Sequence, residues 1–257
     1  MRIRPLGDPP ATADLVVIGG GVVGAATAFH ASRRGLSVVL VEKRPALCAF
    51  TTAAAAGGFR LQLDNEEELT LIGESVEMFL DFEEATGQDK YDAGVRQQGY
   101  LWVTTSEARA AEQRALVEAQ RGWGLEDVQI LDTEAARSEF PFLTPEIVQA
   151  RFRGSDGLLD PKSLTLGLAA GSRADVVLGC AVTGFRIEGG RVAGVDTERG
   201  SISTRTAAIC AGPLSGLVAS LAGVSLPVET VVRHKLVVPA LPAVPVEAPM
   251  TIDDDTG

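Results

Sequence analysis

Two short, continuous apolar runs flank an alanine-rich stretch near the start of the chain. Residues 14–19 (Asp-Leu-Val-Val-Ile-Gly) form the first run and residues 36–42 (Leu-Ser-Val-Val-Leu-Val-Glu) form the second. Because apolar residues follow one another rather than alternate, both runs are typical of strands buried on both faces. Residues 22–34 between them predict a helix that Gly35 ends. The pattern therefore predicts a βαβ unit with a parallel strand pair.

The rest of the chain predicts a mixture of helices and strands. A helix with Asp64 as its N-cap is expected. Further helices are expected over 106–121, 133–140, 161–173 and 213–221, with Ser106 as an N-cap and Pro161 at N1. Strands are expected at 99–105, 148–153, 176–178, 201–210, 228–238 and 250–253. Residues 182–188 and 191–197 predict a hairpin around Gly189-Gly190. These elements indicate an α/β protein.

Composition and charge exclude several classes of function. The chain has 34 Asp and Glu against 23 Lys and Arg, a net charge of −11, which argues against nucleic-acid binding. No apolar run is long enough for a membrane span, and residues 1–13 lack the apolar core of a secretory signal. Cys48, Cys180 and Cys210 are widely separated without metal-ligand spacing. We therefore expect no metal site, and a reduced, cytoplasmic compartment.

The motif with the clearest chemistry is Gly19-Gly20-Gly21-Val22-Val23-Gly24, a G-x-G-x-x-G between the first strand and the first helix. Gly19 allows the tight turn, and Gly21 lets the backbone approach a pyrophosphate. Gly24 lets the helix pack close to the strand. The free N–H groups and the positive dipole end of the helix then face the phosphates. The motif predicts a dinucleotide-binding site.

Glu42 ends the second strand 18 residues after Gly24. A carboxylate at this position can accept hydrogen bonds from ribose hydroxyls, and it repels the 2′-phosphate of NADP. These residues alone leave FAD and NAD open, and a structural glycine turn beside a surface glutamate is the alternative without function.

Further motifs carry a family resemblance. They are Thr51-Thr-Ala-Ala-Ala-Ala-Gly-Gly-Phe-Arg60, Gly157-Leu-Leu-Asp-Pro161, Val182-Thr-Gly184 and Ala207-Ala-Ile-Cys-Ala-Gly-Pro213. Together with the glycine motif they resemble the FAD-dependent amine and amino-acid oxidoreductases of the D-amino-acid oxidase superfamily. The resemblance is to the branch of glycine oxidase, sarcosine oxidase and dimethylglycine dehydrogenase, and it spans residues 14–257.

The resemblance implies a Rossmann-like FAD-binding domain with a parallel sheet and a substrate domain with a mainly antiparallel sheet. The expected bounds are a flexible leader at 1–13, an FAD domain at 14–85 and 145–220, and a substrate domain at 86–144 and 221–257. FAD is expected to bind without a covalent bond. The resemblance also implies the cofactor-binding residues, which are Gly19, Gly20, Gly21, Val23, Gly24, Glu42, Lys43, Thr51, Thr52, Ala53, Gly57, Gly58, Val182, Ala211 and Gly212.

The implied reaction is oxidation of the C–N bond of a small primary or secondary amino acid. Hydride passes to flavin N5, and water hydrolyses the imine. Arg60 is the candidate for binding the substrate carboxylate, and a surface or phosphate-facing arginine is the alternative. His234 is a candidate substrate-side residue by strand alternation, and a structural or exposed histidine is the alternative. Oxygen or another acceptor would reoxidise the flavin, and the chain could assemble as an oligomer or with another subunit.

Two alternatives stay open. The family usually continues beyond the length of this chain, so the chain could be a truncated FAD-binding fragment without catalysis. We then expect 221–257 to end in an incomplete sheet and the FAD pocket to stand open. An NAD-dependent dehydrogenase fits the glycine motif but not the later motifs.

Overall fold

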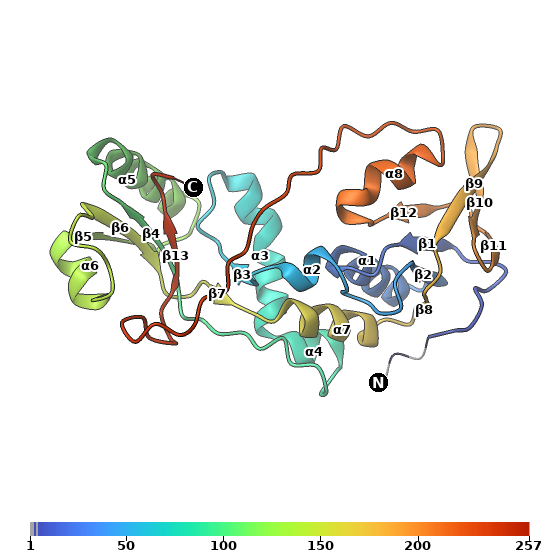
Figure 1. The fold of residues 1–257 in the computed structure, drawn as a ribbon, viewed down its shortest axis with the longest axis horizontal. Helices are drawn as coiled ribbons and strands as arrows, with labels where there is room; N and C mark the ends of the chain where they lie inside the picture. The colour runs from blue at the N-terminus through green and yellow to red at the C-terminus, as the bar shows by residue number, and fades with distance from the viewer. Residues whose placement is uncertain (1–2, 4, 257) are drawn as a thin grey trace. The chain divides into compact units, whose positions relative to one another are not determined.

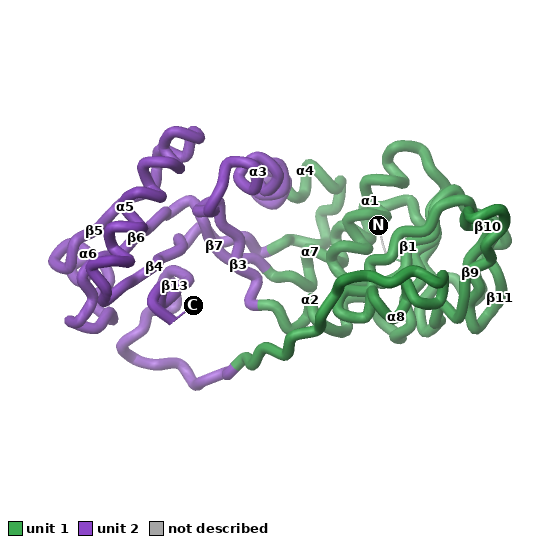
Figure 2. The backbone as a smooth tube through the Cα atoms, turned by 90° about the horizontal axis from the view of Figure 1, so that it is seen from above, with its two compact units in different colours: residues 1–55, 82–93, 160–235 green, residues 56–81, 94–159, 236–257 purple. Residues whose placement is uncertain are grey.

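The computed structural model describes residue 3 and residues 5–256, and it divides the chain into two compact units (Figure 2). The first unit contains Met1–Ala55, Phe82–Ala93 and Asp160–Lys235. The second contains Ala56–Asp81, Gly94–Leu159 and Leu236–Gly257. Each unit is built from several segments, so the chain passes between them repeatedly.

The first unit is built around a parallel sheet with the strand order β12-β1-β2-β8 (Figure 1). Its strands are β1 (Leu15–Ile18), β2 (Val38–Glu42), β8 (Asp175–Leu178) and β12 (Ala207–Ile209). All four residues of β1 are buried, as a strand covered on both faces requires. Helix α1 (Val22–Arg33) connects β1 to β2, which confirms the expected βαβ unit.

Different layers cover the two faces of this sheet. On one face, Val16, Val41 and Val177 pack against Val195 and Ile202 of a second, antiparallel sheet. That sheet has the order β11-β10-β9, with β9 (Val182–Glu188), β10 (Arg191–Thr197) and β11 (Gly200–Ser203). Helix α1 lies against β1 and β2, and α7 (Pro161–Gly171) lies beside α1. The unit therefore stacks helices, a parallel sheet and an antiparallel sheet around a continuous apolar core.

Short helices complete the first unit. They are α2 (Thr51–Ala54), α4 (Phe82–Thr86), the 3-10 turn η1 (Gly212–Leu214) and α8 (Ser215–Ser220). Leu6 and Thr12 of the expected leader form single bridges to Val177 and Ser203, and its residues Met1, Arg2 and Arg4 lie outside the described part of the chain.

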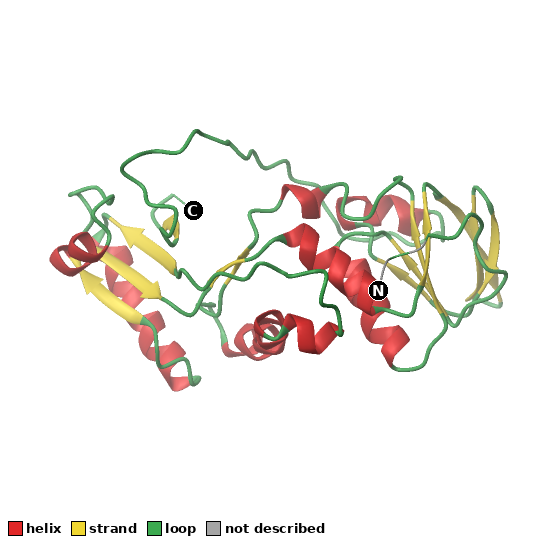
Figure 3. Cartoon of the chain, turned by 90° about the horizontal axis from the view of Figure 1, so that it is seen from below, coloured by secondary structure: helices red, strands yellow, loops and turns green. Residues whose placement is uncertain are grey.

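The second unit contains a four-stranded sheet with the order β13-β4-β6-β5 (Figure 3). Its strands are β4 (Tyr100–Thr104), β5 (Gln129–Asp132), β6 (Gln149–Arg153) and β13 (Met250–Asp253). β13 is parallel to β4, and the other pairs are antiparallel. Two antiparallel two-residue strands, β3 (Gly58–Phe59) and β7 (Gly157–Leu158), pair separately.

Helices of the second unit lie against both faces of its sheet. Ala136 of α6 (Thr133–Glu139) packs with Leu101 and Ala150 on one face. On the other face, the side chain of Gln149 contacts Gln113 of α5 (Glu107–Gly122). Leu61 and Leu69 pack on the cluster around Val117 of α5, so the segment with α3 (Glu66–Leu80) belongs to this unit. The expected FAD domain had included this segment. Assignment of the units to FAD and substrate remains a proposal.

Local helix signals are mostly confirmed. Ser106 caps α5 by accepting from Arg109 N–H, and Asp160 caps α7 with Pro161 in the first turn. Gly189 and Gly190 have φ of 57° and 74°, the left-handed conformations that a tight hairpin turn needs. The expected cap of α3 was wrong by one residue, because Asn65 and not Asp64 accepts from Glu68 N–H at 2.8 Å.

Two strand predictions were wrong. Residues 201–210 form two strands in different sheets, because Thr204 turns the chain and its Oγ1 accepts from Thr206 N–H at 3.2 Å. Residues 228–238 form no strand and are exposed along the whole segment, including apolar Val231 and Leu236. A strand exists only with a partner for its backbone groups, and no strand of the described chain pairs with this segment.

We predict that Gly24→Ala destabilises the protein by about 1–3 kcal/mol or more, because the new Cβ would overlap the carbonyl oxygen of Gly19. Gly73→Ala is the matched control within a helix. A Cβ at Gly73 meets nothing within 4 Å, so alanine should stabilise by about 0.5–1 kcal/mol. Urea unfolding measures both, and equal effects of the two substitutions would contradict the close packing at Gly24.

Candidate functional site

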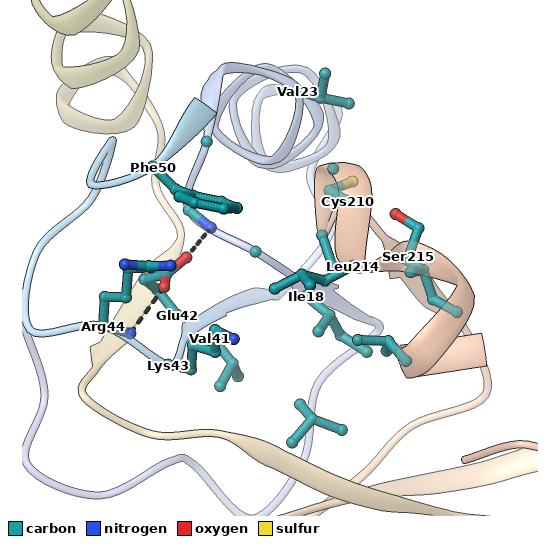
Figure 4. A pocket seen from close by; sticks show the side chains of 18 of the residues that line it. Ile18, Val23, Val41, Glu42, Lys43, Arg44, Phe50, Cys210, Leu214 and Ser215 are labelled. Atoms are coloured by element: carbon teal, nitrogen blue, oxygen red, sulfur yellow. Dashed lines mark hydrogen bonds between the residues drawn. The ribbon is translucent and has the colours of Figure 1, made fainter. Parts of the chain in front are cut away.

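A cavity of about 650 Å³ lies in the first unit, where β1, β2 and β12 reach their carboxyl ends (Figure 4). Ligands of open parallel α/β sheets bind at this edge. Its walls come from the turn after β1, the end of β2, the loop before α2, the start of β9, the end of β12, and η1 with α8. The residues of these walls are Ile18–Val23, Val41–Arg44, Cys48–Thr52, Cys180–Val182, Ile209–Gly212, Leu214, Ser215, Leu217, Val218 and Leu221.

The floor of the cavity is the glycine turn between β1 and α1. Gly19 has φ of 116°, and a Cβ there would overlap the carbonyl oxygen of Cys210. Gly21 is the N-cap of α1 and has no side chain to cap it, and the one atom within 4 Å of a Cβ there is Thr52 Oγ1 at 3.1 Å. The turn therefore presents bare backbone at a helix N-terminus, which is a ready-made anion site.

Glu42 ties the end of β2 to this turn. One carboxylate oxygen accepts from Gly20 N–H at 2.6 Å, and the other accepts from Arg44 N–H at 2.8 Å (Figure 4). A carboxylate has about four acceptor positions, so Glu42 can accept further hydrogen bonds from a ligand. Beside it, the Arg44 guanidinium lies 4.4 Å from the centre of the Phe50 ring.

The loop before α2 closes the turn from the opposite side. Thr52 Oγ1 accepts from Val22 N–H, the first N–H of α1, at 3.2 Å. Cys48 N–H donates to Gly20 O at 2.8 Å. These bonds explain why a segment some 30 residues away in sequence shares the cavity with the glycine motif.

Three free cysteines contribute to the wall of the cavity. Cys48, Cys180 and Cys210 are free, and all three line the cavity. Burial raises the pKa of the Cys48 thiol, and burial likewise raises the pKa of Cys210. Among the described residues no three His, Cys, Asp or Glu side chains gather as a metal cluster.

Eleven of the fifteen residues expected to bind the cofactor line this cavity. They are Gly19, Gly20, Gly21, Val23, Glu42, Lys43, Thr51, Thr52, Val182, Ala211 and Gly212. Gly24 lies beneath it, against the Gly19 carbonyl, and Ala53 is not part of its wall. Gly57 and Gly58 belong to the second unit.

Sequence reasoning missed the apolar wall that α8 and its flanks provide. Leu214, Leu217, Val218 and Leu221 line the cavity. Their spacing of i, i+3, i+4 and i+7 is that of one helix face, so the periodicity of this segment was the signal that could have found them.

The two candidate substrate residues lie in different environments. Arg60, in the second unit, is half-buried, and its guanidinium lies 5.2 Å from the Trp102 ring centre and 5.7 Å from that of Tyr100. His234, in the first unit, lies on the exposed segment 228–238 and not in a strand. The alternation that singled out His234 is therefore absent.

Comparison with protein families and known proteins agrees with this geometry. The family described as FAD dependent oxidoreductase (DAO) matches residues 14–257. Sarcosine dehydrogenase of Mus musculus is 32% identical over 239 residues, which are 89% of this chain and 26% of that protein. The beta subunit of sarcosine oxidase of Rhizobium meliloti is 31% identical, over 90% of this chain and 56% of that protein.

Solved structures show the same fold. L-proline dehydrogenase from P. horikoshii superposes with a TM-score of 0.77 at 27% identity, covering 84% of this chain and 57% of that one. Glycine oxidase from Bacillus cereus has a TM-score of 0.71 at 27% identity, covering 81% and 58%. The chain thus spans about a quarter of the mouse protein and little more than half of the others. No helix in the described part of the chain has the length and apolar character to cross a bilayer.

We predict that Glu42→Ala lowers the free energy of unfolding by about 1–2 kcal/mol, because it leaves the N–H groups of Gly20 and Arg44 without their acceptor. Glu42→Gln, which keeps one acceptor oxygen, should lose less. Urea unfolding without any ligand tests this, and an Ala variant as stable as the parent would show that the carboxylate does not hold the turn.

Proposed function

Since this chain belongs to the family of FAD dependent oxidoreductases, we propose that its first unit binds the ADP part of FAD in the cavity above Gly19–Gly21. The observation that carries the proposal is the arrangement of a bare glycine turn, a helix N-terminus and the Glu42 carboxylate in one cavity. The glycine turn and the helix N-terminus suit a pyrophosphate, and the Glu42 carboxylate suits a ribose.

The roles of individual residues follow from their positions. Gly19 and Gly21, at the N-terminus of α1, would face the pyrophosphate, and the Glu42 carboxylate would accept from the adenosine ribose hydroxyls. Lys43, Thr51, Thr52, Val182, Ala211 and Gly212 line the same cavity and would contact the rest of the bound nucleotide. Gly24 would act through packing, and Ala53, Gly57 and Gly58 remain candidates from the family resemblance. Burial raises the pKa of the Cys48 and Cys210 thiols, which suits non-covalent binding.

We propose that the reaction is oxidation of the C–N bond of a small amino acid with a primary or secondary amine. The names of the relatives support this class, because sarcosine, glycine and L-proline all carry a carboxylate beside that bond. FAD, when bound, supplies the two-electron acceptor for this chemistry. The part assigned to the protein is to bind and orient the substrate, and Arg60 is proposed to hold its carboxylate through the planar guanidinium.

His234 keeps no role in this proposal. Its side chain is exposed and makes no hydrogen bond within the described chain, so nothing orients it toward a substrate. Oxygen or another acceptor would complete the cycle. A second subunit is a candidate partner because one relative is named as a beta subunit. The cytoplasm remains the compartment that the free cysteines favour, although relatives such as sarcosine dehydrogenase of Mus musculus are named as mitochondrial.

We predict that Gly21→Val abolishes FAD retention, because a branched side chain would occupy the space over the turn and press on Thr52 Oγ1. Gly216→Val is the control, since a Cβ there meets nothing within 4 Å and Gly216 does not line the cavity. FAD content per chain after purification, with circular dichroism to show that both variants fold, decides the assignment. Full flavin content in the Gly21 variant would contradict it.

Turnover separates the proposed enzyme from the two alternatives. The purified chain loaded with FAD is expected to lose its flavin absorbance when sarcosine, glycine or L-proline is added without oxygen. Bound FAD that none of the amino acids reduces would favour an FAD-binding fragment without catalysis. Binding of NAD in place of FAD would favour the dehydrogenase alternative.

A further inference from the structure

One face of the sheet in the second unit carries charged and aromatic side chains instead of an apolar core. β4 and β6 are antiparallel, and their register pairs Tyr100 with Arg153 and Trp102 with Arg151. Residues opposite each other in such a pair point to the same face. The intervening residues, Leu101 among them, point to the other face, into the cluster that α6 covers.

The two arginines of this face differ sharply in their partners. Arg153 is ion-paired twice, from Nε to Asp127 Oδ1 at 2.6 Å and from Nη1 to Asp156 Oδ1 at 2.5 Å. Arg151 is only 3% exposed, yet within the described chain it forms no ion pair and donates no hydrogen bond. Its Nε and Nη1 are buried without a partner, and so is the indole Nε1 of Trp102 beside it.

A buried, unpaired guanidinium is a costly group for a fold to keep. Burial lowers the pKa of Arg151, and the positive charge of Arg60 lowers it further. The more distant carboxylates of Asp254, Asp64 and Asp156 act in the opposite direction. None of these carboxylates is within ion-pair distance, and two already serve other groups. Asp156 accepts from Arg153 and Gln62, and Asp254 accepts from Gln113.

Arg60 brings a second guanidinium to the same aromatic ring. Its Cζ lies 5.2 Å from the centre of Trp102, and Arg151 Cζ lies 5.1 Å from that centre. The one hydrogen bond of the Arg60 side chain in the described chain is from Nε to Gln62 O, at 3.4 Å. Two cations thus share one ring, and no carboxylate of the described residues is paired to either.

The chemistry that this cluster lacks is an acceptor with negative charge. The buried groups without partners on Arg151 and Trp102 are all N–H donors. Buried amide oxygens without partners also exist, on Gln62 and Gln120, but a neutral amide does not offset the charge of two guanidiniums. A carboxylate supplies both the charge and two planar oxygens that match a guanidinium fork.

We propose that Arg151 is a carboxylate-binding residue and that, with Arg60, it holds one carboxylate beside Trp102 in the second unit. Identification of this carboxylate with that of the amino-acid substrate rests on the proposed function. Binding of a carboxylate to this cluster does not depend on the proposed function, because Arg60, Trp102 and Arg151 all belong to the second unit.

The test is a titration of the full chain with acetate, without FAD. The chain contains two tryptophans, so Trp123→Phe leaves Trp102 as the single indole reporter. Acetate at constant ionic strength, exchanged against chloride, should change Trp102 fluorescence saturably. In the Trp123→Phe background, Arg151→Met should weaken acetate binding roughly tenfold or more, the loss expected for a charge-assisted pair.

Two further variants keep the test decisive. Arg114→Gln is the matched control, since Arg114 is an exposed cation that contacts Gln149 near the same sheet, and it should leave acetate binding unchanged. Arg151→Lys keeps the buried charge but not the fork, so it should fold and bind acetate more weakly than the parent. With chloride alone, Arg151→Met should melt at a higher temperature than the parent, because it removes an unpaired buried charge.

The proposal is overturned if acetate acts no differently from chloride, if sulfate saturates the signal and acetate does not, or if acetate binds the Arg151 variants as it binds the parent. A lower melting temperature of Arg151→Met in chloride also counts against it, as a structural role predicts. Acetate binding without amino-acid oxidation would refute the proposed function alone. Oxidation without acetate binding would refute this inference alone.

Discussion

The contact between α1 and β1 at Gly24 and Gly19 is the constraint on which the first unit depends. A Cβ at position 24 would overlap the Gly19 carbonyl, and a Cβ at position 19 would overlap that of Cys210. The absence of both side chains lets three backbone segments approach one another. That approach places the start of α1 over the ends of β1 and β12, at the wall of the cavity. Protein interiors pack too densely for such an approach with larger residues.

The second unit obeys a different constraint, the need to pair buried charge. Its sheet has one apolar face, while the other buries Arg153 between two carboxylates and fixes the amides of Gln62, Gln113 and Gln149 by hydrogen bonds. Polar groups in such a place are retained only where partners exist. Arg151 departs from this order, and residues that break a local rule of stability are often those that serve a ligand.

Local signals in the sequence were sufficient for much of the fold and of the nucleotide cavity. The glycine turn, the cap at Ser106, the position of Pro161 at the start of α7 and the hairpin at Gly189-Gly190 depend on the conformation of a few adjacent residues. The contact of the loop at Thr52 with the same turn came from the family resemblance. The apolar wall of α8 was readable in principle, because its spacing is that of a helix face.

The amino-acid sequence alone shows where the chain can turn and where a helix can be capped, since those properties are set by neighbours along the backbone. Whatever depends on partners distant in sequence is settled by the three-dimensional packing. Residues 201–210 divide between two sheets. Residues 228–238 are rich in residues that favour strands, yet they form none, because no strand of the described chain lies beside them to pair with. Arg151 and Arg153 are alike in a strand pattern. Their difference arises because Asp127 and Asp156 reach one guanidinium and no described carboxylate reaches the other.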